Sequence, residues 1–372
     1  MIANLKPSRA YLGVFYTDWV EKLQSTRLWL QDMNAQFNDP SNFQKLTGFM
    51  NYLFSGMNPT TIDTEMLRNS GMSSYKPVQI RYIPYKGTGN LITSDASGTC
   101  DKVAQRRDII TTVEPTLYAE DKFTIEENYV RDNLENGMNI QRRLNLEMRD
   151  AMRNVRESID AQLLAKAAGL FGSNPAAGVG AGSFQDLAMI IGASGKIDDR
   201  NFDQIKNEQE DNYTDGRVGL VGLGNARRYM NRLAVGNAND AGIDYRLVAD
   251  EFGMALFKDS HTTAALGGAN RVLAFYPGSV QYFDYNLFNG DYALDFGDLI
   301  KGTMPDPVFP ISYDYTLKYD DNCSTGNGLQ GAWIGRVIAH FDLWTIPEDA
   351  WGDVYGELND FNAIVGYNIT ES

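Results

Sequence analysis

One long amphipathic helix in mid-chain is the feature that most limits what this sequence can fold into. Residues 138–171 repeat apolar side chains at steps of three and four, which is the spacing of one helix face. This stripe consists of Leu144, Met148, Met152, Val155, Ile159 and Leu163. Glycine and proline in "KAAGLFGSNP" then stop the helix. At about 1.5 Å per residue the rod would be roughly 50 Å long, whereas average helices have about 11–12 residues.

The other face of this helix is charged at intervals of four residues. The pairs with this spacing are Arg143 with Glu147, Arg153 with Glu157, and Arg156 with Asp160. Exposed pairs of this kind contribute only about 0.2–0.5 kcal/mol each, so the apolar stripe must hold the helix in place. Methionines at 138, 148 and 152 could suggest a metal or cofactor site, but at helical spacing they more often fill a core.

Two runs near the end of the sequence predict a long antiparallel hairpin. In "YDYTLKY" and "AWIGRVIAHFDLWTIP" apolar residues alternate with polar ones, and a turn-rich segment, "DDNCSTGNGLQG", connects the runs. The residues expected on one face of each strand are Tyr313, Tyr315, Leu317 and Tyr319 in the first, and Trp333, Val337, Ala339, Phe341 and Leu343 in the second.

An earlier hairpin is predicted ahead of the long helix. Val78, Ile80 and Tyr82 alternate with polar residues, and a second strand returns through "DIITTVEPTLY". The tip between them has about 20 residues, a length that compact domains seldom carry without a function. It is either a loose surface loop or an extended loop that reaches another chain.

Several other segments have helical spacing. An apolar stripe from Trp19 to Phe37 predicts a helix that either packs on its own domain or forms an arm on a neighbouring subunit. Thr124 and Glu127 have capping-box spacing and predict a helix start in "FTIEENYV". "SFQDLAMIIGASG" and "NFDQIKNEQEDNY" indicate two shorter helices, and "RVGLVGLGNARRYMNRLAV" indicates a strand, a glycine turn and a helix.

Composition limits the class of protein. A hydrophobic fraction of 43% supports real cores, and no apolar run is long enough to cross a bilayer. We expect a soluble protein made inside the cell, with Cys100 and Cys323 as free thiols in a reducing compartment. With 48 acidic and 33 basic residues the net charge is −15, which argues against nucleic acid as the main partner because phosphate binding needs a dense basic face.

Sequence motifs for catalysis, cofactor binding or metal binding are weak. Gly222 and Gly224 follow a strand as in a dinucleotide fold, but Arg227 stands where the third glycine of that motif belongs. The only histidines are His261, expected in a loop, and His340, expected in a strand, and no nucleophile elbow or zinc motif accompanies them. The acidic clusters, such as Glu208 with Glu210 and Asp211, are expected on solvated faces. We therefore predict no catalytic, cofactor-binding or metal-binding residues, and no cofactor.

The order of the elements resembles the Hong Kong 97-type fold of tailed-phage major capsid proteins. "TVEPTLYAEDKFTIEENYV" is similar to the strand that leaves the extended loop and the short helix before the spine helix. "RRLNLEMRDAMRNVRESIDAQLLAKAAGLFG" is similar to that spine helix, including the acidic residue near its end, Asp160, and the closing glycine. "GRVGLVGLGNARRYMNRLAV" and "NRVLAFYPGSVQYF" resemble elements of the central domain, and "GLQGAWIGRVIAHFDLWTIPEDAW" resembles the long peripheral strand.

The resemblance implies an α+β capsid fold with a defined order of domains. The expected parts are an N-terminal arm at 1–70, an extended loop at 71–118, a peripheral domain at 119–183 and 336–372 with the spine helix at about 138–171, and a central (axial) domain at 184–335. It implies a virion protein, made in the host cytoplasm, that self-assembles as pentamers and hexamers into an icosahedral shell around double-stranded DNA. Scaffolding, portal and decoration proteins are further implied partners, and no enzyme activity or membrane contact is implied.

Two variations within this family and two alternatives outside it follow from the sequence. Lys86 lies near the loop tip, but no motif identifies an asparagine partner, so we expect no covalent cross-link. Only about 65 residues precede the loop, which favours a separate scaffolding protein over a built-in one. The alternatives are an encapsulin-type compartment shell and a nicotinamide-dependent enzyme using Gly222 and Gly224.

Overall fold

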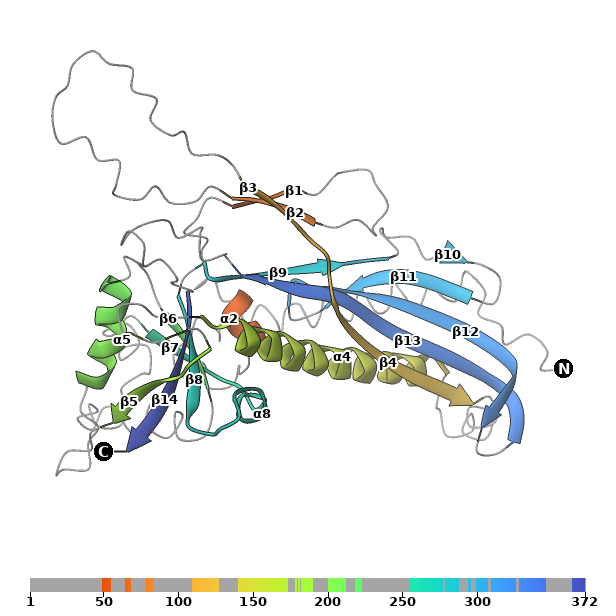
Figure 1. Ribbon diagram of the computed structural model, residues 1–372. Coiled ribbons are helices and arrows are strands. Elements are labelled where there is room, and N and C mark those ends of the chain that lie inside the picture. The colour runs from red at the N-terminus through yellow and green to blue at the C-terminus, as the bar shows by residue number, and fades with distance from the viewer. Residues whose placement is uncertain are drawn as a thin grey trace, which may run out of the picture.

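The computed structural model has an α+β fold, as expected, with three separate β-sheets and one dominant helix (Figure 1). The residues that it describes are 49–54, 64–67, 78–82, 109–126, 140–172, 178, 180, 182–189, 200–211, 218–222, 254–276, 278–287, 294–295, 299–306, 309–325, 328–345 and 363–371. The N-terminal stripe from Trp19 to Phe37, the loop tip with Lys86, Cys100 and Gly224 lie outside these residues. Among the described helices, none combines the length and the apolar character needed to cross a bilayer.

The dominant helix is α4, Ile140–Leu170, with 31 residues. All six residues of the predicted apolar stripe are buried, from Leu144 at 7% exposed to Leu163 at 0%, which confirms both the helix and its buried face. Figure 1 shows α4 running along the strands β4 (Leu117–Glu126) and β13 (Gly328–Thr345), which are its main packing partners.

The largest sheet has six strands and is antiparallel throughout. Its order is β10 (Leu294–Asp295), β11 (Leu299–Pro305), β12 (Ser312–Thr325), β13 and β4, and β9 (Val280–Tyr285) pairs with the far end of β13. The register places Tyr315 opposite Val337 and Tyr319 opposite Trp333, so the long C-terminal hairpin and its two predicted faces are confirmed. Val337 and Phe341 are fully buried on the face that packs against α4.

The strand β4 corrects one prediction. Thr124 does not cap a helix but lies in β4, where it pairs with Ile334 of β13. The cause is a period of two in this segment, since Phe123 and Ile125 are buried and Thr124 between them is exposed. The outer edge of β4 is covered in part by the helix, because the Gln162 side-chain amide of α4 donates to the Tyr118 carbonyl at 2.9 Å.

The six-stranded sheet crosses the boundary expected between the central and the peripheral domain. β13 runs without a break from 328 to 345, so the boundary expected between 335 and 336 falls inside one strand. The strands β11 and β12 lie in the range expected for the central domain, yet they share a sheet with β4 and β13. The expected division into domains stays a prediction.

A five-stranded sheet lies at the C-terminal end of α4 (Figure 1). Its order is β5 (Gln185–Met189), β14 (Ile364–Glu371), β8 (Arg271–Phe275), β6 (Val218–Gly222) and β7 (Met254–Lys258). β5 corrects a second prediction, since this segment was expected to be helical. It pairs in parallel with β14, a partner from the far end of the sequence. The strand predicted at β6 is confirmed and is fully buried.

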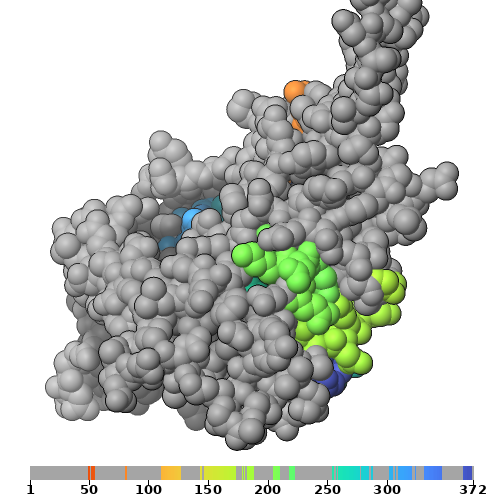
Figure 2. Space-filling model, turned by 90° about the vertical axis from the view of Figure 1, so that its left-hand side faces the viewer, coloured from red at the N-terminus to blue at the C-terminus, as the bar shows by residue number. Residues whose placement is uncertain are grey.

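Two short helices accompany this sheet. α5, Arg200–Asp211, confirms the helix predicted there. Figure 2 shows α5 beside β5 on one surface of the molecule, and the Gln185 side chain of β5 hydrogen-bonds to Glu208 of α5. α8, Thr262–Leu266, follows β7 and precedes β8.

The third sheet has three strands and confirms the earlier hairpin. β1 (Thr64–Leu67), β2 (Val78–Tyr82) and β3 (Ile109–Val113) lie in sequence order and are antiparallel. Val78 pairs with Val113, and Tyr82 pairs with Ile109 at the end from which residues 83–108 depart. Since β3 is followed directly by β4, this hairpin is joined to the largest sheet.

Candidate functional site

The elements α4, β6, β7 and β9 all contact α2, Phe49–Phe54, a helix of 6 residues. Its side chains Phe49 and Tyr52 are fully buried. The Phe49 ring lies 4.9 Å from the ring of Phe275 on β8, and the Tyr52 ring meets Phe257 of β7 edge-on at 5.6 Å. Aromatic pairs at such distances add to the stabilisation from burial. The helix therefore fills the space between α4 and the five-stranded sheet.

Gly219 of β6 leaves room for the Tyr52 ring. A Cβ at position 219 would lie 2.2 Å from Cε2 of Tyr52, which is far inside van der Waals contact. The Tyr52 ring therefore rests directly on the backbone of β6. Burial raises the pKa of Tyr52 well above its ordinary value, and its hydroxyl faces the backbone carbonyls of Phe275 and Tyr276 at 3.5 and 3.4 Å.

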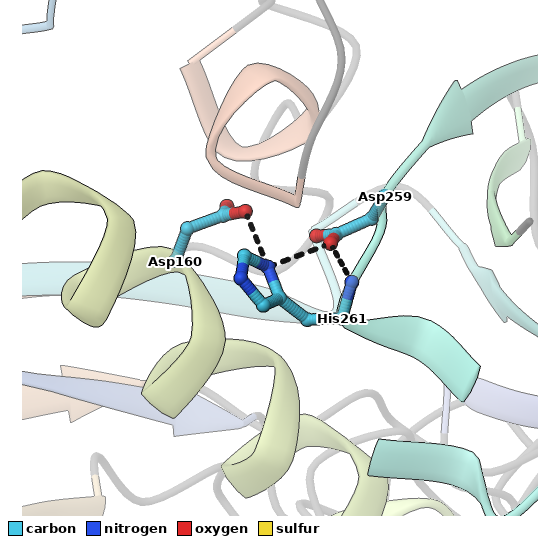
Figure 3. Close-up of side chains that lie close together, drawn as sticks. All are labelled: Asp160, Asp259 and His261. Carbon is cyan, nitrogen blue, oxygen red and sulfur yellow. Dashed lines mark hydrogen bonds and ion pairs between the residues drawn. The ribbon is translucent and has the colours of Figure 1, made fainter. Parts of the chain in front are cut away.

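Two carboxylates, those of Asp160 and Asp259, accept hydrogen bonds from the first two amides of α2. Figure 3 shows both side chains together with His261. The Phe49 N–H donates to Oδ2 of Asp259 at 2.9 Å, and the Met50 N–H donates to Oδ1 of Asp160 at 2.8 Å. Asp160 comes from the C-terminal half of α4, and Asp259 directly follows β7. The first N–H groups of a helix have no partner within it, so these contacts satisfy donors that would otherwise be buried unpaired.

His261 lies between the two carboxylates. Its Nδ1 is 3.0 Å from Oδ1 of Asp259 and 3.6 Å from Oδ2 of Asp160, and its backbone N–H donates to Oδ1 of Asp259 at 2.8 Å. The Thr262 hydroxyl donates to the Asp259 carbonyl at 2.8 Å and closes this turn at the start of α8. One local turn therefore sets the positions of Asp259 and His261, and the helix α4 sets that of Asp160.

The electrostatics of this cluster follow from its burial. Asp259 is 2% exposed, and this desolvation, together with the nearby charge of Asp160, raises its pKa to about 6. The hydrogen bond to Asp160 and the charges of both carboxylates raise the pKa of His261 to about 9, although its partial burial acts in the opposite direction. At neutral pH His261 is therefore an imidazolium between two acidic groups.

The same three side chains could in principle hold a cation, because their ligand atoms lie within 4.8 Å of one another. However, all four carboxylate oxygens already face a nitrogen, either a backbone N–H or Nδ1 of His261. A metal would have to displace these donors. The arrangement fits the role of an anchor for α2 better than that of a metal site.

This anchor was not predicted. The sequence placed Asp160 in an exposed pair with Arg156 and His261 in an ordinary loop, whereas the structure brings Asp160 and His261 together from distant segments. No local spacing connects position 160 with 259 and 261, so the only signal was the acidic residue near the end of the spine helix.

The remaining charged side chains of α4 also reach other elements. Lys166 forms an ion pair with Asp342 of β13. Asp342 is 0% exposed, and its carboxylate also accepts a hydrogen bond from the Thr116 N–H at 2.9 Å. Arg156 lies 3.7 Å from the buried carboxylate of Asp306 rather than beside Asp160. These contacts join α4 to β13 and to the residue that directly follows β11.

The other two predicted pairs on α4 have different outcomes. Arg143 and Glu147 do pair, as predicted. Arg153 instead lies 3.9 Å from Asp150, three residues earlier. The side chains of Arg153 and Asp150 are each 60% exposed, so their ion pair contributes little to stability.

The structure also places four other residues that stood out in the sequence. Glu208 was expected on a solvated face, but it is buried. Its carboxylate accepts a hydrogen bond from the Tyr367 hydroxyl at 2.6 Å. His340 lies in β13 with its ring 5.1 Å from that of Tyr118, and burial lowers its pKa. The Gly222 carbonyl accepts the Asp259 N–H at 3.4 Å. Cys323 of β12 is a free thiol among the described residues.

Comparison with known proteins gives only distant similarities. No protein-family model matches the sequence, and no curated protein matches it. The capsid of cyanophage P-SCSP1u is similar at 10% identity and a TM-score of 0.40, over 81% of this chain and 85% of that one. A structure of Mycobacterium phage Bobi has 13% identity and a TM-score of 0.41, over 88% and 91% of the two chains. The capsid of Myoviridae phage XM1 has 11% identity and a TM-score of 0.38, over 87% and 92%.

All three are phage structures, and two are capsids. All three TM-scores are below 0.5.

Proposed function

We propose that this chain is the major capsid protein of a tailed phage, a structural subunit without enzyme activity. The observation that supports this most is α4, a 31-residue helix that packs along β4 and β13 of a six-stranded sheet. A single-layer shell needs subunits that stay rigid over a long distance. A long helix bonded to long antiparallel strands supplies this rigidity in one direction.

Ion pairs at buried positions support this role. Lys166 contacts Asp342 and Arg156 contacts Asp306, and both carboxylates are 0% exposed. Such pairs fix geometry more than they add stability, because desolvation offsets much of their attraction. An assembly subunit benefits from a fixed shape because every contact with a neighbour depends on it.

The three-stranded sheet supports a role in contacts between subunits. β2 and β3 form a hairpin, and residues 83–108 connect them beyond the described part. On β3, Ile110 is 51% exposed, and a connection as long as residues 83–108 is seldom kept in a compact domain without a function. We propose that this hairpin contacts neighbouring copies of the chain.

The finer parts of the proposal concern the complete particle. We propose pentamers and hexamers of this chain in an icosahedral shell around double-stranded DNA, with scaffolding, portal and decoration proteins as partners and the virion as its location. A net charge of −15 fits a wall that encloses DNA without binding it tightly. An encapsulin-type shell is the alternative, and nucleic acid inside the particle would distinguish the two.

The dinucleotide alternative is not proposed. β6 ends at Gly222 and pairs in parallel with β7, but its other neighbour, β8, is antiparallel. Dinucleotide folds bind their cofactor at the carboxyl ends of parallel strands on both sides of a crossover.

The test is assembly of the purified full chain, followed by sedimentation velocity and negative-stain microscopy at increasing concentration and with an inert crowding agent. We expect closed shells or rings with five- and six-fold symmetry. A matched variant replaces residues 83–108 with a short turn between β2 and β3. It should keep the circular dichroism spectrum of the intact chain and lose assembly. An intact chain that stays monomeric under all these conditions, and also in the presence of its scaffolding protein, would contradict the proposal.

A further inference from the structure

We propose that the buried carboxylate of Asp342 fixes the direction in which the three-stranded sheet leaves the body of the molecule, meaning α4 and the two larger sheets. It does so by holding Thr116 at the junction between β3 and β4. Asp342 is thus a positioning residue for the three-stranded sheet. Because these contacts lie within one chain, their role is independent of the assembly proposed above.

The junction between the two sheets is short and stiff. β3 ends at Val113 and β4 begins at Leu117, so only residues 114–116 connect them. Figure 1 shows β3 running directly into β4. Pro115 holds its own φ at about −65° and restricts Glu114 to extended conformations. Few backbone torsions can therefore change the direction of the three-stranded sheet, and those of Thr116 are among them.

Asp342 holds Thr116 through both of the donors of this residue. The Thr116 N–H donates to Oδ2 of Asp342 at 2.9 Å, and the Thr116 hydroxyl donates to the same oxygen at 2.8 Å. The next residue, Leu117, pairs with Phe341 in the sheet. The contact with Asp342 therefore extends the fixed part of the chain by one residue beyond the sheet, up to the proline.

The carboxylate that holds Thr116 is itself fixed in place. Asp342 is 0% exposed. Its Oδ1 accepts the Leu343 N–H at 2.7 Å and pairs with the Lys166 ammonium of α4. Hydrogen bonds to charged groups are roughly twice as strong as those between neutral groups. Since Oδ1 faces β13 and α4 while Oδ2 faces the junction, one side chain connects the junction to two elements of the body.

The burial of this charge indicates a positional role. A buried ion pair such as that of Asp342 with Lys166 can be replaced by well-packed apolar side chains without loss of stability. Stability alone therefore does not require a carboxylate at position 342. An apolar side chain there could not accept the two hydrogen bonds of Thr116, so the carboxylate adds control over the junction.

The experiment measures the distance between the three-stranded sheet and α4 by double electron–electron resonance on the full chain. Spin labels are attached to Ile110→Cys on β3 and to Leu146→Cys on α4, positions that are 51% and 42% exposed. Cys100 and Cys323 are first replaced by serine, and a large excess of unlabelled chain removes distances between copies. We expect one narrow distance peak. A broad distribution would overturn the proposal, because the direction of the sheet would then not be fixed.

The test variant combines Asp342→Leu with Lys166→Met. It removes the acceptor for Thr116 and leaves no buried charge unpaired, so the core can stay packed. Thr116 is exposed, so water can accept its N–H. The φ of Thr116 can then vary over the allowed extended region, which spans about 100°, and we expect the distance distribution to become at least about twice as wide. A distribution as narrow as that of the unmodified chain would overturn the proposal, because other contacts would then direct the sheet.

A second label pair reports on the body alone. It joins Leu146→Cys to Lys318→Cys on β12, where the lysine side chain is 53% exposed. This distance should give the same narrow peak in the unmodified chain and in the double variant. If it broadens as much as the distance to β3, Asp342 maintains the packing of the body and the proposed role at the junction is wrong.

Glu120→Gln is the matched control variant. Glu120 is also a carboxylate that contacts a cation, but it lies within β4 and its contact is with Arg336 across the sheet. The substitution should leave both distances as narrow as in the unmodified chain. A broadening equal to that of the Asp342 variant would contradict the proposal, since it would mean that loss of any ion pair near β4 frees the three-stranded sheet.

Discussion

Close approach of an aromatic ring to the backbone explains why position 335 is a glycine. Gly335 of β13 lies opposite Phe123 of β4 in the register, and the Phe123 ring covers it. A Cβ at position 335 would lie 2.0 Å from Cζ of Phe123. The ring is 8% exposed and packs in the core with Leu317 and Val337, so it has little room to move. The glycine lets an aromatic side chain fill the space between the sheet and α4.

Gly335→Ala should therefore destabilise the protein by about 1–3 kcal/mol, the range for an added methyl group in a packed core. The measurement is urea unfolding followed by far-ultraviolet circular dichroism. The control is Gly169→Ala on α4, where a Cβ would meet nothing within 4 Å. That substitution should leave stability unchanged or raise it by up to about 1 kcal/mol, because alanine favours a helix. Equal midpoints for the two variants would show that Phe123 does not confine position 335.

Elements with a strong local period are those that the sequence predicted correctly. The stripe of α4 repeats over the whole helix, and β12 and β13 alternate over long runs with a turn between them. Each of these patterns is set by neighbours in the sequence and by one buried face. α4 and the β12–β13 hairpin could therefore be identified without knowledge of their tertiary partners.

Elements whose partners are distant in the sequence were missed. β5 was read as a helix, but it is a strand because β14, from the other end of the chain, pairs with it. Glu208 was expected in solvent, but Tyr367 of β14 contacts it. The anchor of α2 depends in the same way on Asp160 and Asp259, which only the fold brings together. Local propensity carries no information about such long-range contacts.

The packing of α4 gives a test at the scale of this element. Leu163 is 0% exposed in the core that α4 shares with the sheets, whereas Leu146 on the same helix is 42% exposed. Leu163→Ala should cost about 2–5 kcal/mol, since it leaves a cavity. Leu146→Ala should change stability by less than about 0.5 kcal/mol. Both substitutions keep a helix-forming residue, so urea unfolding compares burial alone. Similar costs at both positions would mean that α4 does not pack as described.

The whole molecule combines a rigid framework with a strongly acidic composition. α4 joins the largest sheet through Lys166 and Arg156 and meets α2 through Asp160. The net charge of −15 is spread over a chain that also carries 33 basic residues. On one described surface, two basic residues share an acid. On the face of β4 and β13 away from α4, Glu120 contacts Arg336 at 2.7 Å and Lys122 at 3.1 Å.

This pairing leads to a prediction about DNA. In the proposed shell the wall must not bind the enclosed genome tightly, and at that face the described cations Arg336 and Lys122 both pair with Glu120. The contact with Arg336 lowers the pKa of Glu120 to about 2, so the carboxylate stays charged over all physiological pH. At about 150 mM salt, where the Debye length is about 8 Å, the purified chain should not retard duplex DNA in a gel.

Glu120→Lys is the informative variant, because it replaces the shared acid with a third cation beside Lys122 and Arg336. It should bind duplex DNA weakly at about 10 mM salt and lose this binding at about 150 mM, since each phosphate contact releases counterions. Its far-ultraviolet spectrum should match that of the unmodified chain, because Lys122 and Arg336 are 62% and 40% exposed and can turn into solvent. Tight binding of DNA by the unmodified chain at about 150 mM salt would contradict a non-adhesive wall, and it would point to a basic surface elsewhere on the molecule.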